Sequence, residues 1–165
     1  MSNADIQNEV EMRAVIQRVE KSSVISDGIP TGKSENGLMI LLGVRRGDDE
    51  NDCDILAEKI SKLRIFSDEN GKMNKSIVDV GGSALVISNF TLYANYAHGN
   101  RPDYFSSEEP SRASELYDRF CKKLGSCVHV ETGVFGADMK ISMICDGPVT
   151  IVMDSEILKN KGKDK

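Results

Sequence analysis

Apolar residues run almost without interruption through "GLMILLGV", residues 37–44. A short continuous apolar run indicates a central strand that is buried on both faces. A second buried strand is predicted through residues 85–87, directly after the Gly81-Gly82 turn. The segment "MRAVIQRVEKSSVIS", residues 12–26, is rich in β-branched side chains and predicts either one bent strand or two strands. The chain therefore contains a substantial β component.

Two segments, residues 48–66 and 109–125, place apolar side chains three or four positions apart, which is typical of amphipathic helices. Asp48 and Asp49 are candidate N-caps of the first helix. Ser111 stands near the start of the second helix, and Gly125 ends it. The apolar positions of the two helices are Ile55, Leu56, Ile60, Leu63, Leu116, Phe120 and Leu124.

Turn residues separate the remaining runs. "DGIPTG", residues 27–32, has turn chemistry, Asn70-Gly71 is a hairpin signal, and residues 95–105 have a loop-like composition. Three short β runs follow the second helix: "CVHVETGVF", "MKISMICDG" and "PVTIVMD". The pattern predicts a single α+β domain of mostly antiparallel strands with two main helices.

The ends of the chain differ from this domain in composition. We expect residues 1–11, which are polar and acidic, to form a loose leader or a remnant of expression, with the domain spanning residues 12–153. Residues 154–165 predict a basic, solvated C-terminal tail. Its lysines are Lys159, Lys161, Lys163 and Lys165.

Composition narrows the classes of function. The net charge of −5 argues against unspecific binding of nucleic acid, and no apolar run is long enough to span a membrane. We expect a cytoplasmic protein, because the start has no signal peptide and the four cysteines are scattered without CxxC spacing. With only two histidines, far apart, we expect no metal site, and we expect no cofactor.

Candidate chemistry lies in three segments: "SNFTLY" at residues 88–93, "TGVFGADM" at 132–139 and "DGPVT" at 146–150. Each also has a purely structural interpretation. The polar residues of the first could end a strand, Phe135 and Met139 could belong to the core, and the Gly-Pro pair could form a bulge or an edge turn.

Six segments resemble, in the same order, those of the D-aminoacyl-tRNA deacylase (D-tyrosyl-tRNA deacylase) family. The similarity extends from Met12 to about Met153. It implies a compact, barrel-like α+β domain, a homodimer, and hydrolysis of the ester of a D-amino acid on the terminal adenosine of tRNA. The segments are "MRAVIQRV", "RIFSDENGKMN", "SNFTLY", "NRPDYF", "GVFGADMKISM" and "DGPVT".

The resemblance also implies roles for individual residues. The catalytic segment maps to residues 88–91, and a Gly-cis-Pro motif that enters the active site of the partner subunit maps to Gly147 and Pro148. Arg18 would hold that motif in place. The full set comprises the catalytic segment Ser88, Asn89, Phe90 and Thr91, the motif Gly147, Pro148 and Arg18, and the adenine pocket Phe135, Gly136, Ala137 and Met139.

The chain departs from the family pattern at two positions: Asn89 stands where glutamine is usual, and Cys145 stands where asparagine is usual. The shorter amide makes a side-chain contact with substrate less favourable, so we expect backbone N–H groups near Phe90 and Thr91 to stabilise the oxyanion. No histidine lies in the motif to activate Thr91 as a nucleophile, so we expect Thr91 to position groups while the ribose 2′-hydroxyl assists.

A cis Gly-Pro pair would present two carbonyl oxygens and no side chain, which suits an ammonium group. An L-residue would collide with this surface, whereas a D-residue and glycine would fit. The resemblance implies hydrolysis of D-aminoacyl-tRNA, and this geometry predicts that glycyl-tRNA is also accepted.

Two alternatives remain open at this point. One is a nucleic-acid-binding protein like the DNA-unwinding-element-binding relatives of the family, and the other is the L-specific sister deacylase, which has proline at the position of Ser88. Arg101 is either a loop anchor or a substrate contact. The tRNA end would need only a small basic rim, for which the candidates are Arg45, Arg46, Lys72, Lys75, Lys122 and Lys123.

Overall fold

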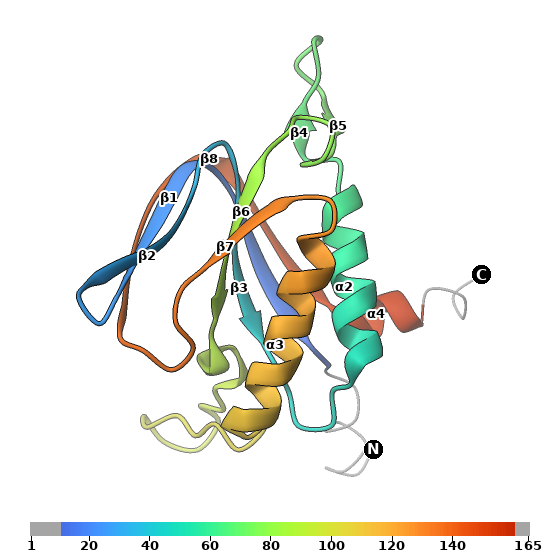
Figure 1. The fold of residues 1–165 in the computed structure, drawn as a ribbon. Helices are drawn as coiled ribbons and strands as arrows, with labels where there is room; N and C mark the ends of the chain where they lie inside the picture. Colours follow the sequence, from blue (N-terminus) through green and yellow to red (C-terminus); the bar gives the residue numbers. More distant parts are fainter. Residues whose placement is uncertain (1–10, 161–165) are drawn as a thin grey trace.

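The structure, a computed structural model, describes residues 11–160 (Figure 1). One six-stranded sheet carries two long helices on one face. The strands of this sheet are β1 (Arg13–Ser26), β2 (Ile29–Ser34), β3 (Gly37–Gly43), β6 (Ser83–Ser88), β7 (His129–Thr132) and β8 (Met139–Asp154). The other elements are α2 (Glu50–Lys62), β4 (Phe66–Ser67), β5 (Met73–Lys75), η1 (Phe90–Tyr93), α3 (Pro110–Leu124) and α4 (Ser155–Lys159).

The sheet is organised around β1. Its residues 13–19 pair with β3 and its residues 22–26 pair with β2, while β8 pairs along its whole length; all three pairings are antiparallel. The order β2-β1-β3-β6-β7 then continues through two parallel pairs, β3 with β6 and β6 with β7. The backbone N–H of Lys33 in β2 donates to Glu131 of β7 at 3.1 Å, so the two ends of this path meet and nearly close a barrel. The predicted α+β fold with a barrel-like β core is confirmed.

The strand β3 separates two layers of core, as its continuous apolar sequence predicts. Leu38, Ile40 and Leu42 belong to the main core beneath the helices, whereas Met39 belongs to a smaller cluster on the opposite face. Because both faces are covered, the side chains on both sides of β3 are buried, apart from Leu41, which is half-buried. The main core also contains Phe120 of α3, which is fully buried.

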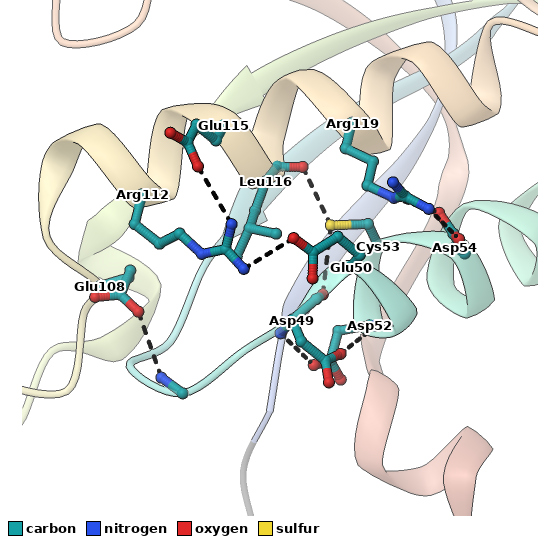
Figure 2. A network of polar contacts seen from close by, with 11 residues as sticks. Asp49, Glu50, Asp52, Cys53, Asp54, Glu108, Arg112, Glu115, Leu116 and Arg119 are labelled. Atoms are coloured by element: carbon teal, nitrogen blue, oxygen red, sulfur yellow. Dashed lines mark hydrogen bonds and ion pairs between the residues drawn. The ribbon is translucent and has the colours of Figure 1, made fainter.

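Polar contacts join α2 to α3 across their solvent-facing sides (Figure 2). Arg119 binds both carboxylate oxygens of Asp54, at 3.0 and 2.8 Å, and Arg112 reaches Glu50 at 3.0 Å. Beneath them the Cys53 thiol donates to the Leu116 carbonyl at 3.2 Å. Burial raises the pKa of Cys53 to about 12, so this thiol is a packing group. The cysteines Cys53, Cys121, Cys127 and Cys145 are all free, and the last two are exposed.

The helix α2 starts later and ends earlier than predicted. Its N-cap is Asp49, which forms a capping box with Asp52. Asp48 is not a cap: it is buried, and a side-chain oxygen of its carboxyl group accepts from the Arg45 backbone N–H at 2.6 Å. Burial raises the pKa of Asp48 to about 7, against an ordinary value of 3.8.

The raised pKa of Asp48 predicts that Asp48→Asn is stabilising in a pH-dependent way. Between pH 4 and pH 7 the carboxyl ionises in the unfolded chain but remains neutral in the fold, so wild-type stability falls as pH rises. We compare the free energy of unfolding of the variant with that of the wild-type protein. We expect this difference to favour the variant by up to about 4 kcal/mol more at pH 8 than at pH 4. Urea unfolding of both proteins at the two pH values measures this. An identical difference at both values would contradict the assignment.

Three further boundaries differ from the sequence predictions. Within residues 27–32 only Asp27 and Gly28 form the turn, and Pro30 lies in β2, an edge strand, where a missing N–H is tolerated. The helix α3 begins at Pro110 with Glu109 as its cap and ends at Leu124, so the predicted segment 109–125 is one residue too long at each end. The two β runs on either side of Gly147 form one strand, β8, of 16 residues.

The predicted basic tail is corrected over its first part. Asp154 belongs to β8, and residues 155–159 form α4. The Lys159 ammonium is not solvated alone: it lies 2.8 Å from Asp52 and 2.9 Å from Glu11. The folded domain thus continues beyond Met153, whereas residues 161–165 and the leader up to residue 10 lie outside the described residues.

Candidate active site

The parallel pair of β3 and β6 positions the segment of residues 88–91. Ser88 ends β6 opposite Leu42, and the Asn89 backbone N–H donates to the Leu42 carbonyl at 2.8 Å. The chain then leaves the sheet as the short helix η1. Because parallel strands end at the same edge, this segment lies at the rim of the core.

Asn89 is the N-cap of η1. Its side-chain oxygen accepts from the Thr91 backbone N–H at 3.1 Å and also from the Thr91 hydroxyl. The Thr91 hydroxyl proton is therefore engaged by an amide oxygen, which is not a base. Neither His98 nor His129 lines the pocket at this site, within the described part of the chain. These contacts favour a positioning role for Thr91 over that of a nucleophile, and the role stays a prediction.

A cavity of about 600 Å³ opens beside this segment. It brings together two of the three segments that the sequence singles out, residues 88–90 and 135–139, which are more than 40 positions apart. The residues that line it are Val44, Arg46, Ser88, Asn89, Phe90, Tyr104, Ser107, Glu108, Glu109, Pro110, Ala113, Phe135, Gly136, Ala137 and Met139. Thr91 is outside this set and reaches the pocket only through its bonds to Asn89.

Aromatic rings form much of the cavity wall. Phe90 packs edge-to-face on Tyr104 with ring centroids 5.1 Å apart, and Phe90 remains 58% exposed. Phe135 lies against Tyr117 of α3 at 6.1 Å between centroids. The exposed ring of Phe90 and the half-buried rings of Tyr104 and Phe135 provide flat apolar surfaces on which a nucleobase can stack.

The loop of residues 104–109 and the start of α3 complete the cavity. Of these residues, only Tyr104 was singled out from the sequence, within the "NRPDYF" segment. Arg46, which also lines the cavity, was predicted as a candidate for a basic rim. The Ser107 hydroxyl donates to the Phe90 carbonyl at 2.9 Å, which fixes the loop against η1. Loop residues with no periodic pattern leave little signal from which such a placement could be predicted. Arg101 is not among the residues that line the pocket.

The third segment lies elsewhere in the same chain. The Gly147-Pro148 peptide bond is cis, as the resemblance implies, and both residues are exposed. Arg18 donates from Nε to the Asp146 carbonyl at 2.9 Å and from Nη1 to the Ile65 carbonyl at 2.7 Å. Arg18 therefore holds the residue directly before the motif.

Register separates this motif from the pocket. Arg18, beside the motif, pairs with Leu38 in β3, whereas Ser88 pairs with Leu42, four residues further along. That spacing corresponds to about 13 Å along a strand. Neither Gly147 nor Pro148 lines the cavity of its own chain.

Two kinds of feature are absent from residues 11–160. None of the helices there is both long and apolar enough to cross a membrane. No group of three or more His, Cys, Asp and Glu side chains in that part of the chain could hold a metal ion.

Residues 15–154 match the model of the D-Tyr-tRNA(Tyr) deacylase family. The chain belongs to this family. The D-aminoacyl-tRNA deacylase of Persephonella marina is 54% identical over 89% of this chain and 100% of its own length, and that of Aquifex aeolicus is 52% identical over 87% and 98%. Like these relatives, the chain is a D-aminoacyl-tRNA deacylase, a hydrolase that acts on aminoacyl-tRNA.

Solved structures agree with the fold of this deacylase. A c-Myc DNA unwinding element binding protein superposes with a TM-score of 0.80 and 34% identity, covering 86% of this chain and 97% of its own. A probable eukaryotic D-amino acid tRNA deacylase superposes with a TM-score of 0.73, covering 87% and 98%, and its 14% identity shows the fold alone.

Proposed function

We propose that this deacylase removes both D-amino acids and glycine from tRNA and selects chirality with the Gly147-Pro148 motif of a second copy of the chain. The observation that carries the proposal is the separation of the motif from the pocket within one chain. A motif that is exposed on its own subunit, and held there by Arg18, is available to a neighbouring molecule.

The strand β8 supports a homodimer. It pairs with β1 alone among the described strands, so its other edge presents unpaired backbone groups. Its apolar side chains are unusually exposed: Met143 by 39%, Ile144 by 48% and Val152 by 60%. Exposed apolar side chains on a strand with an unpaired edge are typical of an interface between proteins.

The chemistry of the motif suits chiral selection. Main-chain carbonyls accept hydrogen bonds and carry no side chain, so they favour an ammonium group. Once the ester and the ammonium are anchored, a D-residue directs only its α-hydrogen toward the carbonyls, while an L-residue directs its side chain there. Glycine has no side chain to exclude and is accepted.

The pocket accommodates the reacting end of the tRNA in this proposal. The terminal adenine occupies the wall formed by Phe135, Ala137 and Met139, and the ester lies beside Phe90. The Phe90 backbone N–H stabilises the oxyanion in this proposal, since the Thr91 N–H already donates to Asn89. The ribose 2′-hydroxyl assists attack by water, while Thr91 holds the segment in position.

One assay tests the proposal. We expect the purified chain to deacylate D-tyrosyl-tRNA and glycyl-tRNA, to leave L-tyrosyl-tRNA intact, and to have the mass of a dimer in light scattering. Preferential cleavage of the L-ester would instead indicate the L-specific sister. A fully active monomer would refute the cross-subunit motif.

The cap at Asn89 leads to a prediction for this segment. We expect Asn89→Ala to lower the free energy of unfolding by about 1 kcal/mol, the usual loss for a helix cap, and to reduce deacylation as η1 loosens. Asn89→Asp keeps the acceptor oxygen and serves as the matched control. Chemical unfolding and kcat/KM for D-tyrosyl-tRNA measure both effects. If Asn89→Asp lost as much stability as Asn89→Ala, the oxygen would have no capping role.

A second candidate function rests on one comparison, the 34% identity to a structure named as a DNA unwinding element binding protein. A DNA-binding role would appear as salt-dependent binding to duplex DNA without turnover of esters. Deacylation that is specific for the ester separates the two functions.

We favour the cytoplasm as the site of the reaction, because all four cysteines are free.

A further inference from the structure

Arg46 lies at the mouth of the cavity and is exposed. It is the only cationic side chain among the described residues that line the pocket. The rest of the lining is aromatic, aliphatic, neutral polar or acidic. A single positive charge therefore marks one side of the cavity.

The surrounding loop holds this arginine in place. Its backbone N–H donates to the Ser106 carbonyl at 2.9 Å, and its side-chain Nε donates to the Ser107 carbonyl at 3.2 Å. The Ser107 hydroxyl in turn donates to the Phe90 carbonyl. Arg46 is thus connected through one residue to the segment that faces the ester.

The two acidic residues of the pocket are engaged by other groups. Glu108 accepts from the Glu109 N–H at 2.9 Å and from the Gly47 N–H at 3.4 Å. Glu109 caps α3, accepting from the Arg112 N–H and from Ser111. Within residues 11–160, Arg46 forms no ion pair. The Nη groups of its guanidinium are available to a ligand.

We infer that Arg46 binds the 5′-phosphate of the terminal nucleoside of the tRNA substrate. The inference rests on the proposed function, since the nucleoside must occupy the aromatic part of the pocket. A guanidinium whose Nε is already fixed presents its remaining N–H groups as a fork, which matches two phosphate oxygens. Arg46 is therefore a specificity residue. It distinguishes an aminoacyl nucleotide, which carries the 5′-phosphate, from an aminoacyl nucleoside, which does not.

The test uses two inert analogues, 3′-deoxy-3′-(D-tyrosylamino)adenosine with and without a 5′-phosphate. We expect the wild-type protein to bind the phosphorylated analogue about tenfold more tightly, as for a charge-assisted hydrogen bond. Arg46→Gln should bind both equally, with unchanged affinity for the unphosphorylated analogue. Arg46→Lys keeps the charge without the fork and should retain part of the preference.

The matched control is Arg45→Gln, which removes the same charge from the neighbouring residue outside the pocket lining. It should keep the full preference for the phosphorylated analogue. Equal affinities in the wild-type protein, or an unchanged preference in Arg46→Gln, would overturn the inference. A different experiment, the hydrolysis assay, decides the proposed function. That function is refuted if the wild-type protein does not hydrolyse D-tyrosyl-tRNA or glycyl-tRNA.

Discussion

Asp52→Ala is expected to lower the free energy of unfolding by about 3 kcal/mol, as for a buried ion pair that loses one partner. Asp52 is 1% exposed, and its carboxylate accepts from Lys159 at 2.8 Å and from the Ser155 hydroxyl at 2.7 Å. It also accepts from the Asp49 N–H at 2.9 Å, completing the capping box (Figure 2). One substitution therefore releases α4 and weakens the start of α2. Guanidinium unfolding measures the loss.

The pH dependence provides a second readout for Asp52. Burial by itself would raise the pKa of this carboxyl, but hydrogen bonds from Lys159 and Ser155 outweigh it and hold the pKa at about 2. Because this value lies below the ordinary 3.8, the stabilisation is complete above about pH 4 and disappears as pH falls toward 2. The difference between wild-type protein and variant should shrink over that range.

Controls separate this cluster from ordinary surface pairs. Lys62→Ala breaks the exposed pair with Glu58 and should change stability by no more than about 0.5 kcal/mol. A double-mutant cycle with Lys159→Met should give a coupling energy of about 1–3 kcal/mol. Additive effects of Asp52→Ala and Lys159→Met would show that the two residues do not act together.

Gly147→Ala is expected to reduce kcat/KM for D-tyrosyl-tRNA by about 100-fold or more, the scale at which misplacement by 1 Å affects catalysis. An added Cβ would collide with the backbone nitrogen of Val149, so the main chain of the motif must move. Since Gly147 is exposed, we expect the stability of the fold to change far less than the activity. Single-turnover deacylation with D-tyrosyl-tRNA measures the effect.

Gly71→Ala is the matched glycine substitution. Gly71 has a φ of +77°, with no atoms near the added Cβ, in the turn between β4 and β5. An alanine there should cost about 1 kcal/mol of stability and leave deacylation unchanged. If Gly147→Ala retained full activity, the motif would play no part in the reaction.

Periodicity and local chemistry were sufficient to predict most elements of the fold. The unbroken apolar run of residues 37–43 is β3, and the spaced apolar residues of 50–62 and 110–124 are α2 and α3. The resemblance also singled out two segments that line the same pocket, residues 88–90 and 135–139. Both kinds of signal are local, because a few neighbouring side chains determine them.

The sequence by itself therefore determined most element types, the α+β class and two of the segments that line the pocket. Only the tertiary structure decided that β3 pairs in parallel with β6, that Lys159 reaches Asp52, and that Arg46 joins Phe135 around one cavity. It also decided that Gly147 lies outside the cavity of its own chain. These relations connect residues far apart in the chain. They depend on strand register and loop packing, which no local pattern of side chains encodes.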